Sequence, residues 1–112
     1  MDSKEKLDLI CNALDDRKAV DVNVIDVMGL TQMTDYMVVC SGTSNIHIRA
    51  IADRVLEIMK SHGVKGTRAE GYAEARWVLI DFGDVVVHIF DPEDREFYQL
   101  EKFWTGRQAV TA

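Results

Sequence analysis

The sequence predicts a single compact α/β domain in which helices pack on a mixed sheet of four or five strands. Three observations support this fold class. A chain of 112 residues is long enough for one hydrophobic core and too short for two. Hydrophobic residues make up 47% and charged residues 29% of the chain, as in a globular rather than a disordered protein. Helical and strand-like apolar patterns alternate in the order α-β-β-α-(β)-β-β-α.

The first predicted elements are a helix and a strand. Asp2 and Glu5 have the spacing of a capping box, so the helix is expected to begin at about residue 2 or 3. Its apolar stripe consists of Leu7, Ile10, Cys11 and Leu14. Residues 20–27 are rich in β-branched side chains and predict a strand. The apolar parity changes between Val24 and Ile25, so this strand is either buried on both faces or carries a bulge.

A second strand and a second helix follow. Residues 36–40 are an unbroken apolar run, which is typical of a central strand covered on both faces. Ser41–Asn45 opens the helix, and Gly63 indicates its C-terminal end. The apolar stripe of this helix consists of Ile48, Ile51, Ala52, Val55 and Met59. A short edge strand is expected around residues 67–70.

Two strong strand patterns, at residues 77–82 and 85–90, predict a β-hairpin. Gly83 and Asp84 between them indicate a two-residue turn, which sets the pairing register. One face of the hairpin is then wholly apolar and is assigned to the core; it consists of Val78, Ile80, Phe82, Val85, Val87 and Ile89. The opposite face pairs Trp77 with Phe90, Leu79 with His88, and Asp81 with Val86.

This opposite face allows two interpretations. Asp81 is diagonal to His88, within reach of an ion pair and beside a large aromatic residue. Either a helix covers the face and the pair is structural, or the face is partly open. An open face with an aromatic anchor and a polar rim has the composition of a protein interface. The sequence leaves both alternatives open.

The last predicted helix starts at Asp91, with Pro92 at its first position and acidic residues in its first turn. We expect it to run to about Trp104, which ends a domain of residues 1–104, and residues 105–112 to form a flexible C-terminal tail. Its buried stripe consists of Phe97, Leu100, Phe103 and Trp104. Tyr98 lies off this stripe with Glu101 and Lys102, either as an anchor for a partner or as an ordinary exposed tyrosine.

The chemistry-bearing residues do not predict an enzyme. Residues 41–45 precede a helix and could bind a phosphate through backbone N–H groups, but an ordinary helix cap explains them more simply. No later strand carries the paired carboxylates that a magnesium-dependent transferase needs. The histidines and cysteines lack zinc-ligand spacing, and Cys40 lies in an apolar run where a thiol is inert. We therefore expect no catalytic residue, no metal and no cofactor.

Charge and hydropathy limit the kinds of partner that this protein is expected to bind. The formal net charge of −6, with two acidic ends around a mildly basic middle, argues against free nucleic acid. The acidic ends are either solvated helix faces, which is the commoner case, or a surface complementary to a basic protein partner. No apolar run approaches the roughly 20 residues that cross a bilayer, so no membrane partner is expected. The first residues do not resemble a signal peptide. Cys11 and Cys40 are expected to be buried and reduced, as in a cytoplasmic protein.

Three segments together resemble one known family. They are residues 35–44 (DYMVVCSGTS) followed by His47, residues 77–88 (WVLIDFGDVVVH), and residues 98–104 (YQLEKFW). In order and spacing, over roughly residues 3–104, the chain is similar to the Iojap-related ribosomal silencing factors. Each segment is unspecific by itself, whereas their combination is specific.

The resemblance implies a fold related to nucleotidyltransferases but without catalysis. It implies binding to the large ribosomal subunit through large-subunit ribosomal protein fourteen, and a steric block to joining with the small subunit that represses translation when nutrients are short. A homodimer is compatible with it. The expected contact residues are Trp77, Asp81, His88, Tyr98, Glu101, Lys102 and Trp104. The alternatives are a degenerate nucleotidyltransferase-like module that binds nucleotide through Ser41–Asn45, and a residual transferase.

Overall fold

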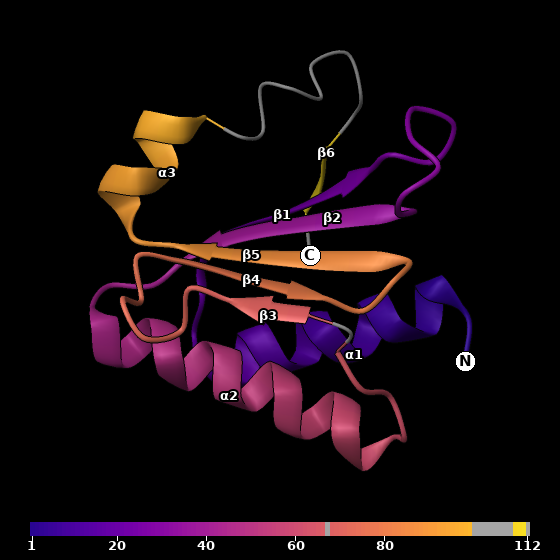
Figure 1. Ribbon diagram of the computed structural model, residues 1–112, viewed down its shortest axis with the longest axis horizontal. Helices are drawn as coiled ribbons and strands as arrows, with labels where there is room; N and C mark the ends of the chain where they lie inside the picture. The colour runs from indigo at the N-terminus through magenta and orange to yellow at the C-terminus, as the bar shows by residue number, and fades with distance from the viewer. Residues whose placement is uncertain (67, 100–108, 112) are drawn as a thin grey trace.

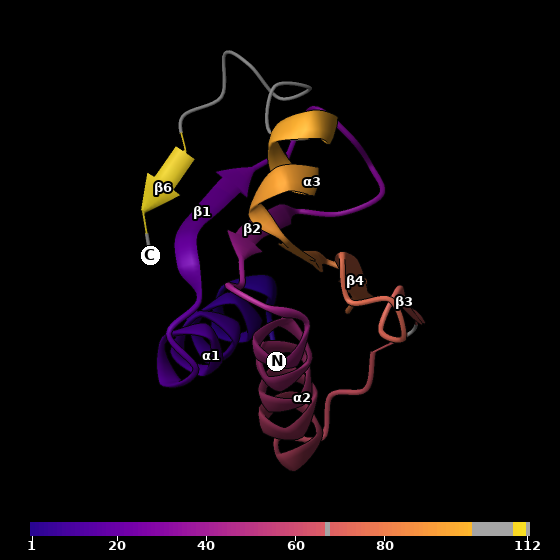
Figure 2. The ribbon, with the colours of Figure 1, turned by 90° about the vertical axis from the view of Figure 1, so that its left-hand side faces the viewer.

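The computed structural model describes residues 1–66, 68–99 and 109–111, which form three helices and six strands. The helices are α1 (Ser3–Asp16), α2 (Asn45–Ser61) and α3 (Pro92–Tyr98). The strands are β1 (Val20–Asp26), β2 (Tyr36–Ser41), β3 (Arg68–Glu70), β4 (Trp77–Asp81), β5 (Val85–Phe90) and β6 (Ala109–Thr111). All strands belong to one sheet, with α1 and α2 on one face and α3 on the other (Figures 1 and 2).

The sheet is mixed, as predicted. Its strand order is β3-β4-β5-β2-β1-β6. The β2 and β5 strands run parallel, whereas the other neighbouring pairs are antiparallel. Val38, Val39 and Cys40 of β2 have no exposed surface, which confirms that the unbroken apolar run forms a central strand. The five expected strands are present, and the fold class is confirmed.

Both alternatives for the first strand are realised in β1. Val20 pairs with Ser41 and Asn23 with Val39, so β1 has one more residue than β2 in this interval, and the strand bulges. Asp21 lies in the bulge with a φ of 51°, in the left-handed region. Beyond it, Val24 and Ile25 are both buried, and they join apolar clusters on opposite faces of the sheet. The bulge therefore lies before the parity change and not at it.

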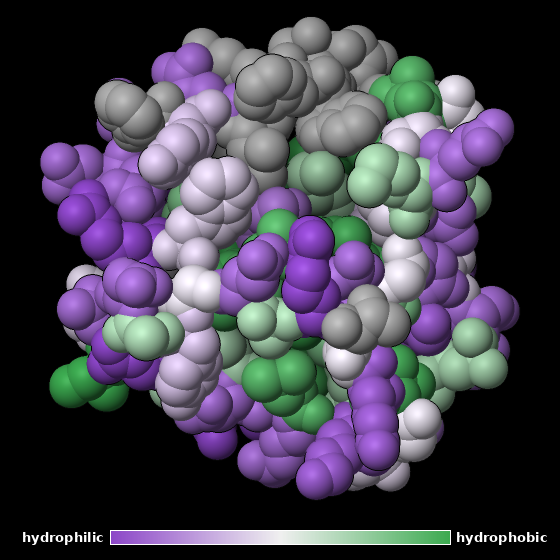
Figure 3. Space-filling model, in the orientation of Figure 1, coloured by the Kyte–Doolittle hydropathy of each residue, from purple (hydrophilic) through white to green (hydrophobic). Residues whose placement is uncertain are grey.

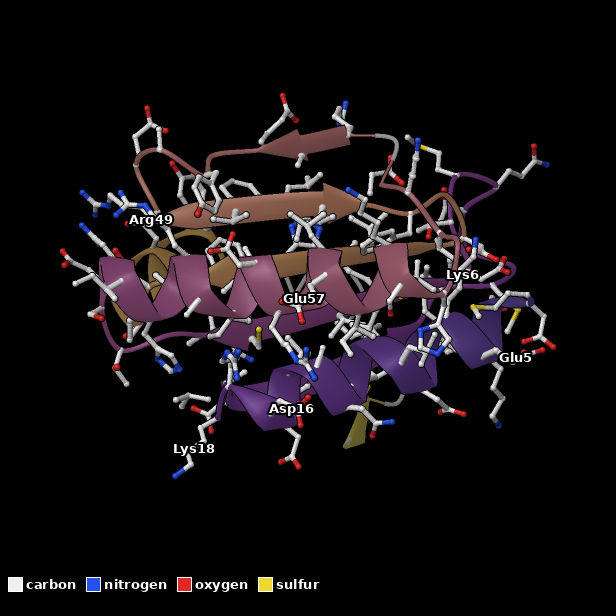
Figure 4. The ribbon with its side chains drawn as sticks, turned by 90° about the horizontal axis from the view of Figure 1, so that it is seen from below. Glu5, Lys6, Asp16, Lys18, Arg49 and Glu57 are labelled. Atoms are coloured by element: carbon white, nitrogen blue, oxygen red, sulfur yellow. The ribbon has the colours of Figure 1, made fainter. Side chains whose placement is uncertain are left out.

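The two long helices begin and pack as predicted. The Asp2 carboxylate accepts a hydrogen bond from the Glu5 N–H at 2.8 Å, and Ser44 caps α2 by accepting one from the His47 N–H at 3.1 Å. The buried residues of α2 are the predicted stripe of Ile48, Ile51, Ala52, Val55 and Met59. In Figure 4 Asp16 of α1 and Glu57 of α2 lie along the seam between the two helices. Arg54 of α2 binds both carboxylates and so links α2 to α1.

The last helix and the C-terminal segment differ from the predictions. The α3 helix ends at Tyr98, not near Trp104, because Gln99 adopts a left-handed conformation (φ 47°, ψ 43°) and its N–H closes the final turn on the Arg95 carbonyl. Leu100, Phe103 and Trp104 of the expected stripe lie outside the described residues. Within the expected tail, Ala109–Thr111 forms the strand β6 and pairs with β1. The sequence pattern did not predict this strand.

Candidate functional site

The β4–β5 hairpin carries chemically different side chains on its two faces. Its register is the predicted one, with Trp77 opposite Phe90 and Leu79 opposite His88, and the Phe82 N–H closes the two-residue turn on the Val85 carbonyl at 2.9 Å. The predicted core face, which packs beneath α1 and α2, is buried in full; its residues are Val78, Ile80, Phe82, Val85, Val87 and Ile89. The candidate site lies on the opposite face.

Four rings form a cluster on this opposite face, which we call the aromatic cluster: Trp77, His88, Phe90 and Tyr98. The Trp77 ring stacks on Phe90 at 4.9 Å and contacts Tyr98 at 4.8 Å. Phe90 is fully buried at the base of the cluster, whereas Tyr98 keeps 46% of its surface exposed. The arrangement buries Phe90 and leaves part of the Tyr98 ring facing solvent, as expected for an anchor residue.

His88 serves this cluster as a neutral hydrogen-bond acceptor. Its Nδ1 accepts a hydrogen bond from the Trp77 indole N–H at 3.0 Å. Burial lowers the pKa of His88 from 6.5 to about 4, so the imidazole is uncharged at neutral pH and its proton is placed on Nε2. A neutral imidazole forms no ion pair with Asp81, whose carboxylate accepts a hydrogen bond from the Gly83 N–H at 2.8 Å. His88 therefore fixes the orientation of the Trp77 ring.

The α3 helix brings Tyr98 to the cluster. Asp91 caps the helix by accepting a hydrogen bond from the Asp94 N–H at 2.7 Å, as the Asp-Pro start predicts. Arg76, the residue before β4, binds the Asp91 carboxylate at 3.4 Å and the Asp94 carboxylate at 2.6 Å. A pocket beside these contacts is lined by Arg76, Glu93, Asp94 and Tyr98. Tyr98 thus lies at the edge of the aromatic cluster, beside a pocket that Glu93 and Asp94 make largely acidic.

The structure unites only part of the predicted contact set. Trp77, His88 and Tyr98 lie together, whereas Asp81 lies at the opposite end of β4. Glu101, Lys102 and Trp104 lie outside the described residues. Sequence reasoning did not assign Phe90 or Arg76 to the site. The sequence signal for Phe90 was its pairing with Trp77 across the hairpin. The signal for Arg76 was the acidic start of the last helix, whose carboxylates favour a nearby cation.

A second exposed apolar group lies in the β1–β2 loop on the same side of the sheet as α3 (Figure 1). Met28, Leu30 and Met33 are 41%, 50% and 88% exposed. Hydrophobic side chains project over this loop at the upper right of Figure 3. The loop is tied internally, because the Leu30 N–H binds the Val27 carbonyl at 3.0 Å and the Met33 N–H binds the Thr31 hydroxyl at 3.1 Å. The sequence signal for this group was apolar residues inside a glycine-containing connection.

The loop at Ser41–Asn45 is accounted for by packing and capping. Gly42 is glycine for a steric reason: a Cβ there would meet Ile48 Cγ1 at 2.6 Å. The His47 ring accepts a hydrogen bond from the Thr43 N–H at 2.9 Å through Nδ1, and its Nε2 lies 2.7 Å from the Arg17 carbonyl. The features that resemble a phosphate site thus hold the end of β2 to the start of α2.

The described residues form neither a metal site nor a membrane-spanning helix. Within this part of the chain, no three or more His, Cys, Asp or Glu side chains gather where they could hold a metal ion. None of the described helices is long and apolar enough to cross a membrane. Both cysteines are free thiols: Cys40 is buried and Cys11 is half-buried.

Comparison with known proteins shows the family. The family model described as "Ribosomal silencing factor during starvation" matches residues 1–112. The chain is 42% identical to the ribosomal silencing factor RsfS of Halalkalibacterium halodurans over 110 residues, which cover 98% of this chain and 94% of that protein. It is 39% identical to RsfS of Bacillus subtilis over 104 residues, covering 93% and 88%. It is also 36% identical to the chloroplastic protein Iojap of Zea mays, covering 85% of this chain and 41% of that protein.

A solved structure agrees with this result. The crystal structure of protein CV0518 from Chromobacterium violaceum has a TM-score of 0.92 and 37% identity, covering 100% of this chain and 93% of the other. Together, the fold and the described site residues define a small α/β domain that presents an aromatic surface rather than a catalytic pocket. The chain belongs to the ribosomal silencing factor family, and the predicted resemblance is confirmed. Members of this family are non-catalytic factors that act on translation through the ribosome.

Proposed function

We propose that this protein binds the large ribosomal subunit, chiefly through large-subunit ribosomal protein fourteen, and blocks joining with the small subunit. Translation is thereby repressed in the cytoplasm when nutrients are short. The proposal rests on membership of the ribosomal silencing factor family. The contact surface is the face of the sheet that carries α3 and the aromatic cluster. Asp81, Glu101, Lys102 and Trp104 remain part of the proposed contact set.

One observation carries the assignment of this surface: Tyr98 is 46% exposed while its ring contacts Trp77 at 4.8 Å. An aromatic side chain held in one orientation loses little conformational freedom on binding, which is why such residues anchor protein interfaces. Glu93 and Asp94 line the pocket beside it. Their charge complements a basic ribosomal protein and steers its approach.

Sedimentation with separated ribosomal subunits tests the proposal directly. The protein is expected to travel with large subunits and not with small subunits, and to lower the yield of joined ribosomes in proportion to its occupancy. Purified large-subunit ribosomal protein fourteen should compete for it. Equal recovery with both subunits, or normal joining at saturating protein, would contradict the proposal. Light scattering of the free protein separates the monomer from the homodimer that the family resemblance allows.

A further inference from the structure

The position of Tyr98 depends on a short helix that lies apart from α1 and α2. The α3 helix has seven residues, and helices of this length are unstable in water without tertiary contacts. Figure 2 shows it on the opposite side of the sheet from α1 and α2, so neither long helix supports it. The contacts that dock α3 on the sheet therefore decide how much of the time Tyr98 lies beside Trp77.

One of these contacts reaches from the middle of α3 into the sheet. The Arg95 guanidinium donates a hydrogen bond from Nη1 to the Ser41 hydroxyl at 3.1 Å, and the same Nη1 lies 3.5 Å from the Val20 carbonyl. Ser41 is only 3% exposed. Ser41 and Val20 pair with each other across β1 and β2, at the bulge that contains Asp21. Arg95 thus ties α3 to two strands at the same point.

A second arginine holds α3 from the other side, but on the surface. Arg76 binds Asp91 and Asp94 at the start of the helix; its own side chain is 56% exposed, and those of the two carboxylates are 23% and 16% exposed. Ion pairs this exposed to water contribute little to stability. The Arg95 contact ends instead on a buried hydroxyl, which would lose a charged partner if the guanidinium were removed. Arg95 is thus the arginine that ties α3 to β1 and β2, whereas Arg76 ties the start of α3 to the segment before β4.

We infer that Arg95 is a positioning residue for ribosome binding: it fixes α3 on the end of the sheet and so holds Tyr98 over Trp77. The inference rests on the proposed function and deepens it. Arg95 acts through Tyr98 rather than through the partner. Without the anchor, α3 exchanges between docked and undocked positions, and the partner binds the docked fraction. The apparent affinity falls in proportion to that fraction, about tenfold if one molecule in ten remains docked.

The test combines hydrogen exchange with binding to large subunits, using Arg95→Met and, as a matched control, Arg54→Met. Arg54 of α2 also joins two elements, because it binds Asp16 of α1 as well as Glu57 of its own helix, but it does so on the helix-covered side of the sheet. In Arg95→Met the amides of residues 93–98 should exchange faster while those of α2 and β5 keep their protection. The dissociation constant for large subunits should rise about tenfold. Arg54→Met should leave the α3 amides and the affinity unchanged.

Ser41→Ala provides an independent variant, since it removes the acceptor and leaves Arg95 in place; it should change α3 exchange and affinity in the same direction. If Arg95→Met does not fold, the same two measurements on Ser41→Ala decide the question. Wild-type affinity in a folded Arg95 variant overturns the inference, whether or not α3 exchange has changed. Failure of the wild-type protein to bind large subunits would overturn the proposed function itself. The exchange comparison would still show whether Arg95 anchors α3.

Discussion

The two faces of the sheet bury their side chains in different ways. On one face, helices of 14 and 17 residues cover a layer of aliphatic side chains that has almost no exposed surface. On the other, a helix of seven residues stands over an aromatic cluster and leaves Tyr98 half exposed. The first face completes its own packing. Among the described residues, the second leaves Tyr98 exposed at the edge of the aromatic cluster, where a partner would bury it.

The aliphatic layer under α1 and α2 and the aromatic cluster differ in the same way. Aliphatic side chains such as Ile51 and Val55 interdigitate at high density and gain most when fully enclosed. Aromatic side chains such as Trp77 and Tyr98 bury a large area even when one edge stays in water, and they change rotamer less readily than long aliphatic chains. The covered face is therefore expected to control stability, and the aromatic face binding.

The largest expected effect lies on the covered face. Ile51 has no exposed surface. Ile51→Ala should therefore lower the free energy of unfolding by about 2–5 kcal/mol, through lost burial and the cavity left behind. Urea denaturation measures the change. The affinity of the remaining folded protein for large subunits should be unchanged, and a matching loss of affinity would break the division between the two faces.

Tyr98→Ala should show the opposite pattern. Removing an anchor should weaken binding to large subunits by about 2 kcal/mol, near thirtyfold. Stability should fall by only about 1 kcal/mol, because the lost contact is an aromatic pair at a half-exposed site. Tyr72→Ala is a suitable control, since Tyr72 is 42% exposed but bonds to Asp53 of α2, away from the cluster. Equal affinities of the two variants would place the contact surface elsewhere.

His88 makes the aromatic face sensitive to pH. Its pKa is about 4 in the folded protein against 6.5 for a free histidine, because burial disfavours the charged form. The unfolded chain therefore takes up a proton below pH 6.5 while the folded chain does not. The contribution to stability is complete above pH 6.5 and is lost as the pH falls toward 4. Between pH 7.5 and 5 the loss should be about 2 kcal/mol.

Urea denaturation at the two pH values measures this loss. His88→Gln supplies the control, since its amide oxygen can still accept the Trp77 indole N–H but has no proton to gain. The difference between the wild-type protein and His88→Gln should therefore shrink or reverse at the lower pH. An identical pH dependence in both proteins would show that His88 is not the titrating group.

The smallest effect concerns the two thiols on the covered side. Burial raises the pKa of Cys40 to about 12, and burial together with Asp8 raises that of Cys11 to about 11. Both should thus be slow to react with a maleimide at neutral pH, Cys40 more so because it has no exposed surface. Mass spectrometry of the labelled protein measures the two rates. Rapid labelling of Cys40 in the native protein would show that the covered face opens.

Local sequence chemistry determined much of this fold. The two-residue turn at Gly83 and the alternation around it set the hairpin register, because a side-chain period of two leaves one pairing that buries the apolar set. The caps at Asp2, Ser44 and Asp91 set the helix starts, because each side chain satisfies an N–H in its own first turn. The same pattern that placed Trp77 beside His88 could not show their hydrogen bond.

Tertiary structure decided the end of α3, the β6 strand and the assembly of the site. An apolar period that continues past Tyr98 predicts a longer helix, and only the left-handed Gln99 ends it. Tyr98 meets Trp77, and Arg95 meets Ser41, across intervals of the chain that carry no shared pattern. Contacts between residues far apart in the sequence depend on how whole elements pack. The sequence could therefore name Trp77 and Tyr98 as candidates, but their contact and its anchor exist only in the folded chain.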